Sequence, residues 1–508
     1  MPSASADTVP ATAQGNPVGD LITQLISRNL QQAVTVRGIH RHLDALQSIA
    51  RANGGNRAAG LPGNTATLRY IQGRLQRAGY RTTVQDFQFP FFQVLAPATF
   101  AEVAPVAKTY KVGVDFDTLK FSPSGTLSGR VVPTRDIVIP PPSQPNSTSS
   151  GCEASDFPPE TAGAIALVQR GTCNYSAKVA NAKAAGAIGV VIFNEGQDGR
   201  TDANPAAALD RYDTVPVLRA TYALGADLYA QAKAGPVTAR LTTSTLGEIR
   251  TTSNVIGETW FGRSDTVVAV GAHNDSVQAG PGINDDGSGI AANLEIAEQL
   301  GRRQLLLRNK VRFFFFGAEE EGLLGSFHYV EQLAEAERKK IKVMLDFDMI
   351  ASPNYVRFVY DGDGSSFPDT AGPNGSGLIE AVFLAHLAQR NLATSPHVFD
   401  GRSDYVAFTN AGIPAGGLYT GSDGVKTAAE ARIYSGTAGR TYDYCYHQAC
   451  DDAGNINDTV LDQFSDAAAH AIVVFGMRRE PVVDPVGRNI PVAAAPHDAA
   501  YKGPLALR

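Results

Sequence analysis

The segments Gly271-Ala-His-Asn-Asp-Ser-Val277 and Gly282-Ile-Asn-Asp-Asp-Gly-Ser-Gly289 decide how this chain folds. Residues 265–272, which lead into the first segment, read DTVVAVGA, a β-branched run typical of a buried strand. Residues 288–304 carry apolar side chains at helical spacing, which predicts a helix after the second segment. The junction from His273 to Asp286 holds one His and three Asp in fourteen residues. A strand, an acidic loop and a helix in this order predict a metal site at the carboxyl end of the strand.

Two further predicted strands also end in acidic residues. Residues 310–316 (KVRFFFF) lead to the consecutive glutamates 319–321, and residues 341–347 lead to Asp348. Carboxylates at the end of a buried strand are costly unless a cation neutralises them. Alternating strands and helices over residues 265–420 imply a largely parallel α/β sheet, in which ligands gather outside the carboxyl ends of the strands. The fold and the acids therefore both indicate hydrolysis by metal-activated water at this edge.

Each of these residues also has an ordinary explanation when it is taken alone. Asp286 could be a first-turn acid of the helix, where the helix dipole favours a carboxylate, and His273 could be a loop histidine. The three glutamates could form a solvated turn, and His447, far downstream, could be an ordinary loop residue. Their grouping at successive strand ends favours the metal site over these separate structural roles.

Seven motifs follow one another along the chain: GAHNDSV, GPGINDDGSG, FFGAEEEGLLGS, FDMIASPN, DGRSD, AGIPAGGLYTG and CYHQACD. In these motifs the chain resembles the di-zinc aminopeptidases of the bacterial leucyl aminopeptidase and aminopeptidase Y type. Residues 42–89 resemble the opening of the same domain. The resemblance implies an α/β fold of the zinc exopeptidase kind, with a mixed, largely parallel central sheet flanked by helices.

The resemblance implies a site for two zinc ions per chain. The positions that match the family's ligands are His273, Asp285, Glu320, Asp348 and His447. His273 and Asp348 match the terminal ligands of one ion, Glu320 and His447 those of the other, and Asp285 matches the carboxylate that bridges both. Nitrogen and oxygen ligands with an open position suit catalytic zinc. Manganese and cobalt are also compatible with these residue types.

Three further positions match residues that act in catalysis. Glu319 matches the general base, which takes a proton from the attacking water and passes it to the leaving amine. Asp275 matches the acid that orients the ligand histidine. Tyr446 matches a hydroxyl that, with a zinc ion, stabilises the oxyanion of the tetrahedral intermediate.

The implied function is that of a zinc-dependent aminopeptidase acting on peptides and proteins with a free N-terminus. Arg402 matches the position whose main chain helps to hold the free amine. Met349 and Tyr419 match positions near the pocket for the first side chain, so we expect a preference for Leu, Met or Phe. The alternatives are a zinc carboxypeptidase of the same superfamily, a non-catalytic binding protein on this scaffold, and a zinc cyclase of similar fold.

Some positions depart from the family pattern. Glu321 stands where an apolar residue is common, and Tyr405 stands where a histidine often follows Ser-Asp. We expect both to affect the lining of the pocket more than the chemistry. Relatives also bind calcium through two acids of the last helix, which Asp462 and Asp466 match, but the accompanying amino-terminal acid is missing around Ala33.

A region of different composition separates the two halves of the predicted peptidase domain. Residues 163–193 within it resemble the protease-associated domain, a small α/β module without catalytic residues in this family; a plain α/β insert is the alternative. The predicted organisation is a disordered segment 1–18, a first peptidase part 19–97, the insert 98–250, a second part 251–480 with the metal site, and a tail 481–508.

The cysteine count and the overall charge bound the remaining possibilities. The simplest pairing of the four cysteines is Cys152 with Cys173 and Cys445 with Cys450, although three connectivities exist. An even count suits an oxidising compartment, so we expect a secreted protein, although no signal peptide is visible in this chain. A net charge of −6 offers no basic face for nucleic acid, and no apolar run is long enough for a membrane span.

Overall fold

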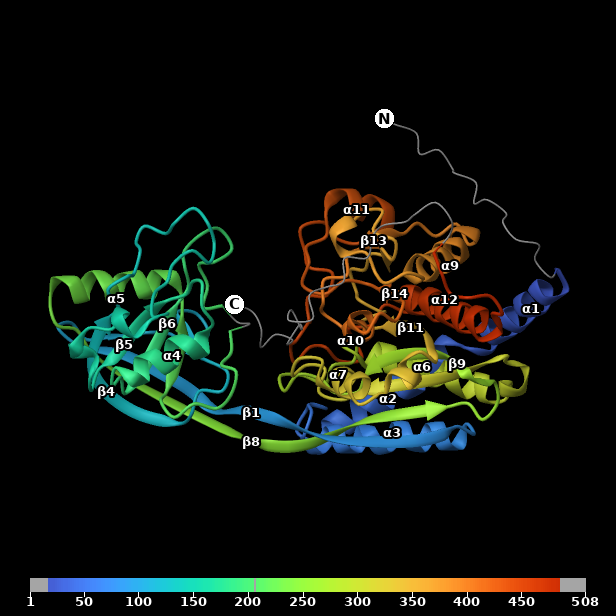
Figure 1. The fold of residues 1–508 in the computed structure, drawn as a ribbon, viewed down its shortest axis with the longest axis horizontal. Helices are drawn as coiled ribbons and strands as arrows, with labels where there is room; N and C mark the ends of the chain where they lie inside the picture. Colours follow the sequence, from blue (N-terminus) through green and yellow to red (C-terminus); the bar gives the residue numbers. More distant parts are fainter. Residues whose placement is uncertain (1–16, 205–206, 485–508) are drawn as a thin grey trace. The chain divides into compact units, whose positions relative to one another are not determined.

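The structure, a computed structural model of the 508-residue chain, describes residues 17–204 and 207–484. The described residues form two compact units (Figure 1). The first unit holds residues 17–85, 253–319 and 325–484, and the second holds residues 86–252 together with the short stretch 320–324. Residues 317–323 link the strand that ends at Phe316 to the helix that begins at Leu324. Most of the predicted disordered segment and tail, residues 1–16 and 485–508, lies outside the described residues.

The first unit is built on a sheet whose central strands run parallel. The strand order is β13-β12-β14-β11-β9-β10-β8. Strands β10, β9, β11 and β14 are parallel neighbours, while β8 and β12 join them in antiparallel fashion. The strands span β8 (Thr238–Glu258), β9 (Arg263–His273), β10 (Asn309–Phe316), β11 (Ile341–Phe347), β12 (Phe358–Tyr360), β13 (Ser395–His397) and β14 (Ala415–Tyr419). The predicted mixed, largely parallel sheet is confirmed.

Helices flank this sheet. Helices α6 and α12 pack against β9 and β10, whereas α10 packs against β11 and β14. The long helices are α1 (Pro17–Ala33), α2 (Val36–Ala52), α3 (Pro62–Arg77), α6 (Gly287–Gly301), α9 (Ser376–Gln389) and α12 (Asp458–Met477). The shorter helices are α7 (Leu324–Glu331), α8 (Glu335–Arg338), α10 (Tyr405–Asn410) and α11 (Ala428–Tyr434), with 3-10 turns at Gln304–Leu306 and Pro368–Thr370. None of the described helices is both long and apolar enough to cross a membrane.

Strand β10 explains why the sheet is covered on both faces. Side chains alternate along a strand, so four consecutive phenylalanines place two on each face. Phe313 and Phe315 belong to the main core cluster with α6 and α12. Phe314 and Phe316 stack on each other, and both rings lie about 6 Å from the ring of Phe408 of α10 (6.1 and 6.0 Å). This burial holds the carboxyl end of β10 in place in the layer between the helices.

The second unit is a smaller α/β module. Its strand order is β8-β4-β5-β6-β7-β3, with β4 to β7 parallel. Its elements are β1 (Arg81–Ala104), β2 (Lys108–Thr109), β3 (Phe116–Thr118), β4 (Gly125–Pro133), β5 (Ile165–Gln169), α4 (Tyr175–Ala184), β6 (Gly189–Phe193), β7 (Val217–Ala220) and α5 (Tyr222–Ala234), with 3-10 turns at Ala154–Asp156 and Pro159–Thr161. Asn174 and Thr221 cap the starts of α4 and α5. The predicted Cys152–Cys173 disulfide is confirmed, with 5.8 Å between the Cα atoms.

Candidate metal centre

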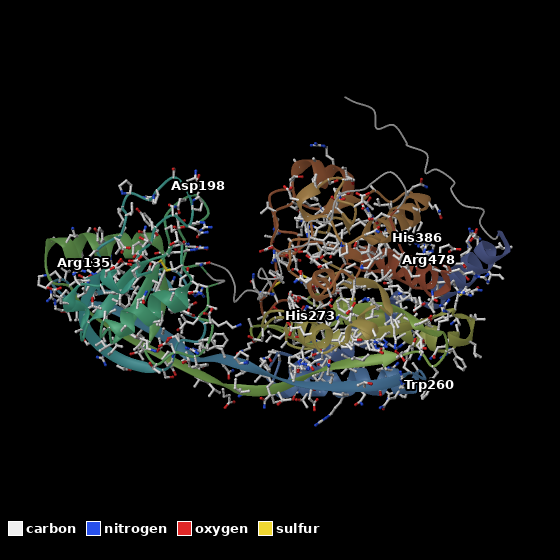
Figure 2. All side chains as sticks on the ribbon, in the orientation of Figure 1. Arg135, Asp198, Trp260, His273, His386 and Arg478 are labelled. Carbon is white, nitrogen blue, oxygen red and sulfur yellow. A yellow bond between two sulfur atoms is a disulfide. The ribbon has the colours of Figure 1, made fainter. Side chains whose placement is uncertain are left out.

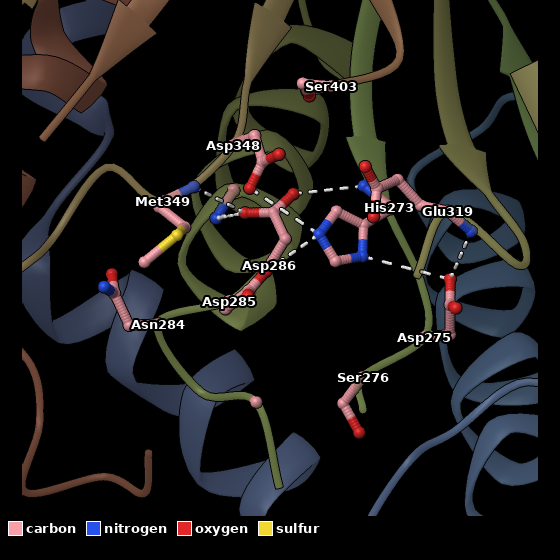
Figure 3. Close-up of polar contacts among 12 residues, drawn as sticks. His273, Asp275, Ser276, Asn284, Asp285, Asp286, Glu319, Asp348, Met349 and Ser403 are labelled. Atoms are coloured by element: carbon pink, nitrogen blue, oxygen red, sulfur yellow. Dashed lines mark hydrogen bonds and ion pairs between the residues drawn. The ribbon is translucent and has the colours of Figure 1, made fainter. Parts of the chain in front are cut away.

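The parallel register brings three strand ends to one edge of the first unit's sheet. Phe316 of β10 pairs with His273 of β9, and Asp346 of β11 pairs with Gly271 of β9. The residues that follow these strands therefore emerge side by side. They are the residues that were expected at this edge, the glutamates after β10 and Asp348 after β11, of which Figure 3 labels Glu319 and Asp348.

His273 lies at the middle of this edge and faces carboxylates on two sides. Its Nε2 lies 3.0 Å from Oδ1 of Asp285 and 3.6 Å from Oδ1 of Asp348 (Figure 3). Its Nδ1 lies 3.9 Å from Oδ1 of Asp275, which also accepts a hydrogen bond from the Glu319 amide. The ring is buried, with 1% of the side chain exposed, so these carboxylates are its polar environment.

Asp285 lies between two histidines. One carboxylate oxygen faces His273, and the other lies 3.2 Å from Nε2 of His447. Burial alone would raise the pKa of Asp285, but hydrogen bonds from the two histidines hold it below its usual range. The candidate ligand atoms of Asp285, Glu320 and His447 lie within 4.8 Å of one another. The Asp285 carboxylate thus lies between His273 and Asp348 on one side and Glu320 and His447 on the other.

Asp286 has a larger role than the first-turn position suggested. Its side chain caps α6 by accepting from the amide of Gly289, and it also accepts from the amides of His273 and Met349. The start of α6 lies so close to the end of β11 that a Cβ on Gly289 would meet the Phe347 carbonyl at 1.9 Å. Asp286 therefore joins three segments that meet at the site.

The loop that carries His447 is fixed to the loop that carries Asp285. The Asp451 carboxylate accepts from the amides of Asn284 (2.8 Å) and Asp285 (3.1 Å). Burial, followed by the nearby charge of Asp443, raises the pKa of Asp451 to about 7. The predicted Cys445–Cys450 disulfide, with Cα atoms 5.2 Å apart, is confirmed and encloses Tyr446 and His447.

The residues predicted to contact substrate have partners in the metal cluster or next to it, and the main chain of Met349 is bonded to that of Thr420, beside Tyr419. Arg402 donates from Nη2 to the Tyr446 hydroxyl at 3.1 Å, and the Tyr446 ring stacks on His447 at 3.8 Å. Met349 is bound through its amide to Asp286, so it adjoins the metal cluster. Tyr419 ends β14 in an aromatic group with Phe358 and His397.

The remaining positions singled out from the sequence have structural partners. Tyr405 is buried, and its hydroxyl donates to Asp400. Of the two candidate calcium ligands on α12, Asp466 pairs with the guanidinium of Arg390 at 2.5 Å. An arginine therefore neutralises the carboxylate that a calcium ion would need, and these residues do not fit a calcium site.

Arg57 is a residue of the site that the sequence reasoning missed. It is fully buried, and all three guanidinium nitrogens donate to main-chain carbonyls: Nε to Pro281, Nη1 to Asn274 and Nη2 to Gly282. Its own amide donates to the Ser276 hydroxyl. Arg57 thus joins the start and the end of the loop that connects β9 to α6. An arginine inside the glycine-rich run ANGGNRAAG was the available signal.

Comparison with known proteins places the chain in a family. The model of Peptidase family M28 matches residues 254–472, and the PA domain model matches residues 128–228. An aminopeptidase of Pseudomonas aeruginosa (strain UCBPP-PA14) is 44% identical over 442 residues, which are 87% of this chain and 81% of the relative. The chain is a member of peptidase family M28. The predicted family and inserted protease-associated domain are confirmed.

Other relatives of this M28 peptidase agree with that assignment. A probable leucine aminopeptidase 2 of Aspergillus oryzae is 37% identical over 423 residues, 83% of this chain and 80% of the relative. The solved aminopeptidase from Aneurinibacillus sp. strain AM-1 has a TM-score of 0.69 at 24% identity and covers 91% of this chain and 98% of its own. BSAP, a zinc aminopeptidase from Bacillus subtilis, has a TM-score of 0.62 at 22% identity and covers 89% and 98%. At these identities the two structures establish the fold alone.

The donor atoms of this M28 peptidase fit divalent cations. Ligands about 2.0–2.1 Å from a tetrahedral ion lie about 3.3–3.5 Å from one another. The nitrogen-to-oxygen distances of His273 and His447 to their carboxylates are 3.0, 3.2 and 3.6 Å, which bracket that value. Imidazole and carboxylate donors are also the types that zinc takes in catalytic sites.

Replacing Arg57 with methionine is expected to weaken zinc binding by about 10–100-fold, the effect of losing a residue that positions ligands. The change leaves three buried carbonyls without their donor, so the loops that carry His273 and Asp285 lose their common tie. Zinc affinity is measured by competition with a chelating dye. Arg57→Lys should restore part of the affinity, and millimolar guanidinium should restore part of it to Arg57→Ala.

The matched control is Arg69→Met, which removes an exposed arginine of α3. It should leave zinc affinity unchanged. If a folded Arg57→Met protein binds zinc as tightly as the unsubstituted enzyme, the hydrogen bonds of the Arg57 guanidinium do not support the metal centre.

Proposed function

We propose that this M28 peptidase is a zinc-dependent aminopeptidase that removes N-terminal residues from peptides and proteins. The observation that carries the proposal is the Asp285 carboxylate, whose two oxygens each face a different histidine. Such a carboxylate suits a pair of ions, one held by His273 and Asp348 and the other by Glu320 and His447. Relatives named as aminopeptidases, one of them a zinc enzyme, support the choice of reaction and metal.

The bound zinc ions would act as Lewis acids and would lower the pKa of a water molecule toward neutrality. Glu319, whose amide is bound to Asp275, takes the proton from that water and later donates it to the leaving amine. Asp275 keeps the His273 ring oriented from its Nδ1 side. The Tyr446 hydroxyl, held by Arg402, donates to the oxyanion as the carbonyl becomes tetrahedral.

Substrate selection follows from the same residues. Acids including Glu319 and Asp348, together with the main chain at Arg402, bind the free α-ammonium group and restrict cleavage to the N-terminal bond. Met349 and Tyr419 line the pocket for the first side chain and favour Leu, Met or Phe. The proposal includes no calcium ion, because Asp466 already pairs with Arg390.

The proposal also covers the location of the enzyme and its binding partners. Two disulfides are consistent with an extracellular protein, because such bonds persist in oxidising compartments. We propose that the protein is secreted and that its partners are peptides with free N-termini. A net charge of −6 argues against nucleic acid as a partner.

The test compares leucine p-nitroanilide with its N-acetylated form. We expect release of p-nitroaniline from the free amine and none from the blocked substrate, because the α-ammonium group is part of recognition. A glutamyl p-nitroanilide should have a lower kcat/KM than the leucyl substrate. Cleavage of amino-blocked peptides alone would instead assign the carboxypeptidase activity, and no cleavage by a zinc-loaded protein would favour a binding role.

A further inference from the structure

A cavity of about 760 Å³ lies at the amino ends of the strands in the first unit, away from the metal centre. Strand β9 runs from Arg263, which lines the cavity, to His273, which belongs to the metal centre. Val268 is the β9 residue of the cavity nearest to His273, and the five residue steps between them correspond to about 17 Å at about 3.3 Å per residue. Figure 2 labels Arg478, which also lines the cavity, and His273. The cavity is therefore a separate feature of the unit.

The floor of the cavity is apolar. Val268 of β9, Val343 of β11, Ile413 and Phe475 of α12 line it, and each belongs to the buried core. The volume falls in the range of small-molecule pockets, about 300–1,000 Å³. Above this buried floor, Ala411, Pro414 and Val482 also line the cavity and are partly exposed, so a hydrocarbon group that covers them gains free energy.

The rim of the cavity is cationic. Two acidic side chains, Glu335 and Glu480, line it beside six cationic ones: Arg263, Arg338, Lys339, Lys342, Arg478 and Arg479. Arg263 and Lys339 already pair with Asp265 and Glu335. The rim therefore carries more positive charge than its own carboxylates neutralise.

Three of these cations have no acidic hydrogen-bond partner within the described residues. Lys342 donates to the Lys339 carbonyl, and Arg478 donates to the Pro481 carbonyl. The Nε of Arg338 is buried and has no hydrogen-bond acceptor among the residues that the structure describes. Buried donors of charged groups are costly when they are left unsatisfied, so this rim favours an anion.

We infer that this cavity is a binding site for a small amphipathic anion, an alkyl chain that bears a carboxylate, sulfonate or phosphate group. The alkyl chain would cover the partly exposed side chains of Ala411, Pro414 and Val482, and the anionic group would accept from Arg338 and Arg478. The competing explanation is that these cations serve only the carboxyl ends of α8 and α12, where the helix dipole favours positive charge.

The test titrates the zinc-loaded enzyme with octanesulfonate by calorimetry, since sulfonates coordinate zinc weakly. We expect saturable binding with one site per chain. Octanol, which lacks the charge, and methanesulfonate, which lacks the chain, should each bind at least about tenfold more weakly. Equal binding of methanesulfonate would assign the site to inorganic anions and overturn the amphipathic class.

Variants separate the cavity from other sites on the protein. Arg338→Gln combined with Arg478→Gln should weaken octanesulfonate binding by at least about tenfold, because two charged donors are lost. Lys342→Gln is the second variant and should also weaken it. The control Arg51→Gln removes an exposed cation in the last turn of α2, outside the cavity, and should leave binding unchanged. Unchanged affinity in folded cavity variants, or no saturable binding to the unsubstituted enzyme, would refute the inference.

Discussion

Alanine at Glu319 is expected to leave both zinc ions bound and to lower kcat/KM for leucine p-nitroanilide by at least about 10²-fold. Proton transfer by a positioned general base contributes about 10²–10⁴-fold to a rate, and alanine removes that group without removing a proposed ligand. Metal content per chain and turnover are measured on the same sample. Near-normal turnover with full metal content would exclude Glu319 as the base.

The two neighbouring glutamates provide matched controls. Glu320→Ala should lose both turnover and zinc, because Glu320 is a proposed ligand whose donor atom lies within 4.8 Å of those of Asp285 and His447. Glu321→Ala should change neither greatly. Three consecutive residues of one turn therefore have three different expected outcomes, which a general loss of local structure could not produce.

Removal of the metal is expected to abolish peptide hydrolysis and to lower the melting temperature. A ligand that binds only the folded state stabilises it, so stripping the ions removes that stabilisation. Two equivalents of zinc per chain should restore both activity and melting temperature. Metal content is measured by elemental analysis before and after chelation.

Variants of the donors sharpen this result. Asp285→Asn should weaken the binding of both zinc ions, because the two carboxylate oxygens of Asp285 face His273 and His447. Asp348→Asn should weaken mainly the binding of the zinc ion beside His273. Full turnover by metal-free protein, or restoration by a single equivalent of zinc, would contradict the two-ion proposal.

The main strands were predictable because their residues allow few other structures. A strand over 310–316 was expected, and β10 spans Asn309–Phe316, since four phenylalanines in a row must be buried on both faces. The helix expected over 288–304 ends earlier, at Gly301. Residues 304–306 form a separate 3-10 turn, and a Cβ at Gly301 would lie 2.2 Å from the Ala78 carbonyl, a close approach of another segment that helical spacing cannot reveal.

The candidate site was only partly accessible from the sequence. His273 and Asp348 stand at strand ends and Asp285 stands just before a helix, and both kinds of position can be read from the spacing of apolar residues. The contacts of Arg57 could not be read in this way, because its partners lie 217 to 225 residues away and are main-chain atoms. Every residue offers the same carbonyl whatever its side chain, so no residue type marks the acceptors of such a bond.

The hydrogen bonds from the Arg57 guanidinium to three main-chain carbonyls have a consequence for which nearby residues can change in sequence. Because the guanidinium grips backbone oxygens rather than side chains, Val277, Gln278 and Ala279 can change identity without loosening their loop. Gly280 is different, since a Cβ there would collide with the Gln448 carbonyl at 2.1 Å. Evolution can therefore vary the surface beside the proposed metal site through this short stretch while Arg57 continues to bind the same main-chain oxygens.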